Sequence, residues 1–209
     1  MFKQLLITVS LSMAGISLAQ ADDLKTPGAS YLFYKLGVYL PDDNDVETAF
    51  ATTERTVVYE NGQALNVGYG WINQNNSRLE IDVTHRKANV ETESGSSSNA
   101  ELEMSQLMMS VYSNVNSPIF FGLGFGVGIA SINLIGRAPT LNADDEGFLS
   151  LKGAIGFTKR ITDSVDFVVE AEYLVTTQIE MSDTSSTTGR TFNLGNSGTT
   201  LLIGARQWF

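Results

Sequence analysis

The sequence predicts an all-β protein, and within that class an eight-stranded antiparallel up-and-down transmembrane β-barrel. Apolar residues alternate with small or polar residues in about eight segments of roughly ten residues, which is the pattern of strands with two chemically different faces. Short and long connections also alternate along the chain. No segment has a convincing helical period, so strands are expected throughout.

The amino-terminal residues have the pattern of a secretory signal peptide. Lys3 supplies the positive start, residues 5–18 the apolar stretch, and an Ala-Gln-Ala motif the cleavage site. Polar residues interrupt the apolar stretch, which makes the alternative, a membrane anchor, a poorer fit. We therefore expect a signal peptide at residues 1–21 and a barrel domain at residues 22–209.

The alternation predicts where the strands lie. The expected strands are residues 31–40, 63–72, 77–87, 102–115, 119–132, 148–160, 165–176 and 198–209. The fifth segment is the clearest, because bulky apolar residues alternate there with glycine. The facing of the fourth segment stays open, because two apolar sets compete: Leu107, Met109 and Val111 against Leu102, Met104 and Met108.

The connections between these strands fall into two groups. Short polar turns are expected at residues 73–76, 116–118 and 161–164, and long loops at residues 41–62, 88–101, 133–147 and 177–197. One end of the barrel therefore carries turns and the other carries loops. In bacterial outer-membrane barrels the turns face the periplasm. Both chain termini are then expected in the periplasm.

The sizes of the residues on the two faces distinguish a membrane barrel from a soluble one. One face carries bulky apolar and aromatic side chains, and the other combines glycine and alanine with charged residues. Small and charged residues suit the narrow interior of an eight-stranded barrel, so the bulky face is expected to meet lipid. The predicted lumen charge network comprises Lys35, Arg78, Glu80, Asp82, Arg86, Lys152, Arg160, Glu170, Glu172 and Arg206.

This charge network has two interpretations. In the first, the charges pair and fill the interior, because an unpaired charge there would be costly. In the second, they line a small gated pore. We favour the filled interior, because eight-stranded barrels have room for side chains and little more.

Aromatic residues supply a second sign of a membrane barrel, since such barrels carry aromatic girdles where hydrocarbon meets water. Six aromatic residues share the outward face near the expected periplasmic ends of their strands. This predicted girdle comprises Tyr34, Trp71, Phe121, Phe157, Phe167 and Phe209.

Together, the signal peptide, the eight alternating segments, the glycine-alternating fifth segment and the terminal Phe209 resemble the opacity-protein and outer-membrane-protein-A-like families of small barrels. The resemblance covers residues 22–209 and implies a Gram-negative outer membrane, porin-like in architecture. It also implies that Ile203, Ala205 and Phe209 form the signal read by the barrel-assembly machinery. Gln207 departs from that pattern, where an apolar or aromatic residue is expected, and the adjacent Trp208 is a candidate to compensate for it.

His85 is the only histidine and is expected to face lipid near the outer end of the third strand. That location resembles the one where eight-stranded lipid A deacylases keep a histidine, with a serine two residues onward. Lys87 stands at that position here. The sequence therefore predicts a protein that is not an enzyme, with no catalytic residue, cofactor or metal site.

Composition limits the partners. A formal charge of −10 without clustered Lys and Arg argues against nucleic acid. The expected partners are outer-membrane lipid and lipopolysaccharide, the assembly machinery, and an extracellular or host ligand held by the loops. The expected function is an integral outer-membrane barrel that presents surface loops, in a structural or adhesion-type role. A small ion channel is the first alternative and a lipid A-modifying enzyme the second.

Overall fold

The computed structural model describes residues 26–48, 55–93, 96–97, 100–113, 117–134, 141–183 and 191–209. The predicted signal peptide at residues 1–21 lies outside these ranges and stays a prediction. Within the described residues, no helix is long and apolar enough to cross a membrane.

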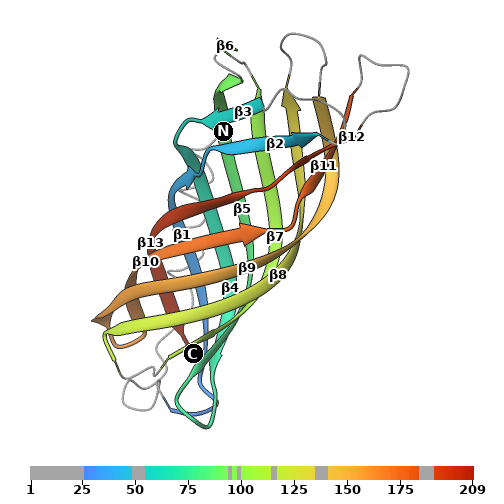
Figure 1. The fold of residues 1–209 in the computed structure, drawn as a ribbon. Coiled ribbons are helices and arrows are strands. Elements are labelled where there is room, and N and C mark those ends of the chain that lie inside the picture. Colours follow the sequence, from blue (N-terminus) through green and yellow to red (C-terminus); the bar gives the residue numbers. More distant parts are fainter. Residues whose placement is uncertain are drawn as a thin grey trace.

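Thirteen strands make up the described fold (Figure 1). They are β1 (Ser30–Pro41), β2 (Asn44–Thr48), β3 (Arg55–Tyr59), β4 (Gly62–Ile72), β5 (Arg78–Glu93), β6 (Ser96–Ser97), β7 (Glu101–Tyr112), β8 (Ile119–Leu134), β9 (Leu141–Thr162), β10 (Val165–Thr176), β11 (Ile179–Asp183), β12 (Thr191–Leu194) and β13 (Ser197–Trp208).

Eight of these strands close into an antiparallel barrel, as the sequence predicted. Going round the wall, the order is β1, β4, β5, β7, β8, β9, β10 and β13, and β13 pairs again with β1. The closing pair runs from Tyr31 opposite Trp208 to Pro41 opposite Gly198. Closure leaves no free edge in this part of the sheet, so its backbone groups bond within the wall.

The two ends of the barrel differ. One end, called the turn end below, holds the start of β1, the end of β13 and the short connections after β4, β7 and β9 (Figure 1). The other, called the loop end, carries β2, β3, β6, β11 and β12, which pair with each other or with the long strands. The long loops expected from sequence are therefore partly strand, and the wall continues beyond the eight predicted segments.

The middle of the barrel is apolar outside and polar inside. Leu123 is 75% exposed and Leu151 67% exposed, whereas Lys35 and Glu80 are fully buried. The bulky residues that the sequence assigned to the outer face are exposed on β8, β9, β10 and β13. This exposed zone is called the apolar belt below.

Toward the loop end the polarity reverses. On β5, Ala88 and Val90 face inward and are buried, while Asn89 and Glu91 are exposed. On β7, Leu102 is buried inside and Leu107 is exposed outside. The fourth segment therefore held two competing apolar sets because its strand passes from one zone into the other.

A column of glycines on β8 faces the interior and admits large side chains from the neighbouring strands. Added methyl groups would overlap the Tyr112 ring at Gly122 and the Phe148 ring at Gly128. Gly153, opposite Leu123 on the outer face of β9, has open space instead and lines an apolar groove of about 580 Å³.

We expect Gly122→Ala to lower the free energy of unfolding by about 1–3 kcal/mol, because overpacking a filled interior forces rings out of place. Gly153→Ala is the matched control and should change the free energy by much less. Urea titration of both variants in the same detergent measures the difference. Equal midpoints for the two variants would contradict the packing described here.

Candidate functional site: the barrel interior and the rim of the loop end

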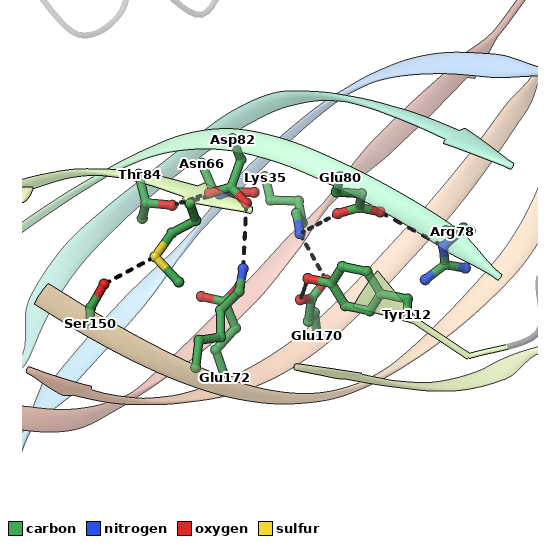
Figure 2. Close-up of polar contacts among 12 residues, drawn as sticks. Lys35, Asn66, Arg78, Glu80, Asp82, Thr84, Tyr112, Ser150, Glu170 and Glu172 are labelled. Carbon is green, nitrogen blue, oxygen red and sulfur yellow. Dashed lines mark hydrogen bonds and ion pairs between the residues drawn. The ribbon is translucent and has the colours of Figure 1, made fainter. Parts of the chain in front are cut away.

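The structure places nine of the ten predicted network residues in the interior, each almost fully buried: Lys35, Arg78, Glu80, Asp82, Arg86, Lys152, Glu170, Glu172 and Arg206. Arg160 differs, because its side chain lies near the turn end and is 34% exposed. Five cations thus face four carboxylates across the lumen. Figure 2 shows the central part of this group.

Glu170 on β10 links three parts of the wall. It accepts a hydrogen bond from Lys35 Nζ of β1 at 2.8 Å, and another from the Tyr112 hydroxyl of β7, also at 2.8 Å (Figure 2). Both carboxylate oxygens are therefore used. β7 and β10 lie three strands apart in the wall, so the contact from Tyr112 spans the lumen, whereas β1 and β10 are separated only by β13.

Glu172, two residues further along β10, forms a second link. Lys152 Nζ donates to one of its oxygens at 2.8 Å and Arg86 Nη2 to the other at 2.9 Å. Lys152 Nζ also lies 3.5 Å from Asp82 of β5. Asp82 in turn accepts hydrogen bonds from Asn66 and Thr84 (Figure 2). This layer joins strands on opposite sides of the barrel.

Glu80 lies close to two arginines near the turn end. Its Oε1 lies 3.7 Å from Arg78 Nε and 3.6 Å from Arg206 Nη2, and accepts a hydrogen bond from the Tyr31 hydroxyl. Both guanidinium groups also lie over the Phe120 ring, at 4.4 and 4.9 Å from its centroid. The ring faces help to stabilise cations that outnumber their carboxylates.

Asp166 of β10 was not in the predicted network, although the alternation of its strand points it inward. Its carboxylate accepts hydrogen bonds from Arg160 Nε and Trp208 Nε1, both at 2.9 Å. Trp208 faces the interior and is buried, so it does not replace the apolar residue missing at Gln207, whose side chain is also buried. Ile203 and Phe209 are exposed, and their role in assembly stays a prediction.

Above the charges, the loop end of the interior is closed by a buried apolar cluster, which the sequence analysis did not foresee. It comprises Tyr39, Val57, Tyr59, Ala64, Ala88, Val90, Ala100, Leu102, Met104, Ala130, Ile132, Phe148, Leu174, Ile179, Leu194 and Leu202. Several members come from the extra strands β3, β11 and β12. Burial raises the pKa of the Tyr59 hydroxyl well above its usual range. The charged layer is thus sealed on this side by hydrocarbon.

The predicted girdle residues all lie on the outer face. Phe121, Phe157, Phe167 and Phe209 are exposed, and Tyr34 and Trp71 are half-buried. Tyr69 adds to the group, with its ring 6.0 Å from Trp71 and 6.2 Å from Phe209 between centroids.

The outer face also carries a small polar group at the edge of the apolar belt. His85 of β5 faces outward, and its Nδ1 lies 3.0 Å from Ser105 Oγ on β7. In the next tier, Lys87 donates to Glu103 at 2.9 Å and to Glu101. These bonds raise the pKa of Lys87, and the bond from Lys87 is the main cause that lowers the pKa of Glu103.

The serine beside His85 escaped the sequence analysis, because it comes from the neighbouring strand and not from the residues after His85. The signal that predicts it is the register between β5 and β7, which sequence alone left open. Among the described residues, no group of three or more His, Asp or Glu is placed to hold a metal ion.

No protein-family model and no curated protein matches this chain. The outer membrane protein OprG from Pseudomonas aeruginosa is similar in structure, with a TM-score of 0.57 and 14% identity over 88% of this chain and 97% of its own. The outer membrane protein AlkL gives a TM-score of 0.57 and 12% identity over 92% and 95%.

Neisserial surface protein A is a third structural neighbour, with a TM-score of 0.50 and 14% identity over 85% of this chain and 97% of its own. The chain therefore has the fold of the small eight-stranded outer-membrane barrels, as the sequence predicted.

We expect Glu170→Ala to lower the free energy of unfolding by about 3–5 kcal/mol, because the buried Lys35 would keep only Glu80, 4.0 Å away and already facing Arg78 and Arg206. Glu103→Ala is the control, since it breaks an exposed pair and should cost about 0–1 kcal/mol. Urea titrations in one detergent compare them. Similar losses in the two variants would mean that water reaches the interior network.

Proposed function

We propose that the protein is an integral barrel of a bacterial outer membrane, with a structural and surface-presenting role. The observation that carries this proposal is the apolar belt, in which residues such as Leu123, Phe125 and Leu151 are exposed around an interior of buried charges. A soluble barrel would face these residues inward.

Placement in the outer membrane is supported by the structural neighbours, two of which are described as outer membrane proteins and one as a surface protein. In outer-membrane barrels the short turns face the periplasm, so the turn end of this barrel faces the periplasm and the loop end faces outside. The lipid and lipopolysaccharide around the belt are then the constant partners, and the barrel-assembly machinery is a transient one.

The surface role is supported by the extension of the wall at the loop end. Strands β2, β3, β11 and β12 form a second tier of antiparallel pairs beyond the belt. This tier holds the connecting loops on a rigid base, an arrangement common for binding loops. An extracellular or host ligand bound by these loops fits that arrangement, and the role needs no catalysis inside the barrel.

Conduction is the second candidate, favoured by the continuous layers of charge in the interior. Against it stand the contacts that span the lumen, from Tyr112 to Glu170 and from Arg86 to Glu172, and the apolar cluster that seals the loop end. Planar-bilayer recordings of the unmutated protein should therefore show at most rare, small openings. Steady, ion-selective channels would reassign the same charges as pore-lining residues.

The membrane placement predicts the effect of a charge on the belt. Phe125→Arg should destabilise the folded barrel by about 2–4 kcal/mol, the cost of Arg on the lipid face near the bilayer midplane, because Phe125 lies midway on β8 between the girdle residue Phe121 and Ile129, which is opposite Ser105. Asn89→Arg on the exposed outer face of β5, beyond the belt, is the control and should be nearly neutral.

Heat-modifiable gel migration after folding into lipid vesicles measures the folded fraction of each variant. A Phe125→Arg protein that folds as well as Asn89→Arg, or an unmutated protein fully soluble without detergent, would overturn the proposal.

The surface role has its own test. Replacing residues 184–190, between β11 and β12, with a Gly-Ser linker should leave heat-modifiable migration unchanged, because the strands on either side keep their pairs. Binding of intact cells to immobilised extracellular-matrix proteins, with and without the replacement, then measures adhesion. Equal binding by the replaced, unmutated and barrel-free cells would argue against adhesion through this loop.

A further inference from the structure

The outer face of the barrel holds one pair of side chains with the geometry of a nucleophile and its base. His85 and Ser105 lie directly opposite each other in the ladder between β5 and β7. Nδ1 of the imidazole lies 3.0 Å from the serine Oγ, within hydrogen-bond distance. This contact holds the hydroxyl against a group that can accept its proton, which is the arrangement that activates serine nucleophiles.

The pair lies at the boundary between the apolar belt and a charged part of the outer face. Toward the turn end, the next outward residues are Val83 and Leu107, each about half exposed, in the apolar belt. Toward the loop end, the next outward residues are Lys87 and Glu103, which are charged and paired. A lipid packed against this wall would set its acyl chains on the apolar tier and its headgroup on the charged tier.

The ester groups of a membrane lipid lie between its acyl chains and its headgroup. The level of His85 and Ser105 is therefore the level at which a carbonyl carbon of such an ester comes closest to the wall. Both side chains are partly exposed on this face. Neither is committed to the buried network of the interior.

We propose that Ser105 and His85 are the nucleophile and general base of an acyl-ester hydrolase that acts on lipids of the leaflet around the loop end. His85 accepts through Nδ1, which requires its proton to sit on Nε2. Glu103, two residues from Ser105 on the same face, places negative charge near the imidazolium that forms. Backbone groups of both strands are committed to the ladder. Lys87 lies at the next outward position of β5, and the one ammonium donor that it does not give to Glu101 or Glu103 is the donor assigned to the developing oxyanion.

The chemistry balances with water as the second reactant. Ser105 Oγ bonds to the ester carbonyl carbon while its proton passes to His85 Nδ1. The carbon–oxygen bond of the ester then breaks, and the leaving alkoxide takes that proton as an alcohol. Water attacks the acyl-serine with the same proton relay, which releases a carboxylic acid and restores both side chains. No electrons are exchanged with an outside carrier.

This activity goes beyond the surface role proposed above, and it revises the expectation from sequence that the protein has no catalytic residue. It depends on the membrane placement only for its substrate. Two lipids offer the same acyl ester at this level: a glycerophospholipid and the lipid A part of lipopolysaccharide. The experiment below separates them.

The first test is labelling with a fluorophosphonate, which bonds covalently to activated serines. The unmutated protein, folded in detergent and verified by heat-modifiable migration, should gain one adduct, located at Ser105 by tandem mass spectrometry. His85→Asn should slow labelling at least tenfold, and Ser105→Ala should abolish it. Ser131→Ala, which alters another outward serine on the neighbouring strand β8, should label at the unmutated rate.

The second test measures fatty acid released from vesicles of phosphatidylglycerol alone and of phosphatidylglycerol with lipid A. Release from both vesicles indicates phospholipid as substrate, and release only from the second indicates lipid A; either should be lost in Ser105→Ala. The proposal is overturned by labelling that is absent, that falls elsewhere, or that is unchanged in His85→Asn. It is also overturned if neither vesicle releases fatty acid. Folding of all variants into vesicles tests the membrane placement separately.

Discussion

The pairing of β1 with β13 is the constraint on which the rest of this structure depends. Strands that lie in hydrocarbon have no water to satisfy their edges, so a sheet can span a membrane only when its first and last strands meet. Closure with eight strands makes the interior narrow. The inward residues must then be small, as on β8, or must reach across and pair, as Arg86 and Glu172 do. The charge network is thus a consequence of closure.

Much of the barrel could be predicted from alternation, because lipid outside and a confined interior impose opposite preferences on successive residues. This holds on β8, where phenylalanine and leucine alternate with glycine, and on β10, where Glu170 and Glu172 point inward. The lipid-facing pattern ends at the loop-end edge of the apolar belt. Beyond His85, the alternation continues, but the outward residues are polar and the inward ones apolar. The sequence therefore predicted polar loops where β2, β3, β11 and β12 lie.

The same physical reason explains what the sequence did not show of the candidate site. Ile179 and Leu194 join the apolar cluster from short strands whose neighbouring residues Glu180 and Asn193 are polar and exposed, so no lipid-facing pattern marks them. The contact between His85 and Ser105 depends on the register of two strands, and the fourth segment gave two competing registers. A contact between residues on two neighbouring strands can be predicted only when the register of the strands is known. Residues on one strand share a face whatever the register.

With the membrane placement proposed above, the reversal of polarity at the level of His85 and Ser105 also fixes how deep the barrel sits in the bilayer. In a thicker bilayer, Lys87 and Glu101 would be drawn into hydrocarbon, and in a thinner one Val83 and Leu107 would meet water. Both changes cost energy. Because the eight strands are hydrogen-bonded to each other, no single strand can slide along its neighbours to reduce this cost. In the proposed placement the barrel therefore matches one bilayer thickness, and lipids of matching chain length should gather around it in preference to others.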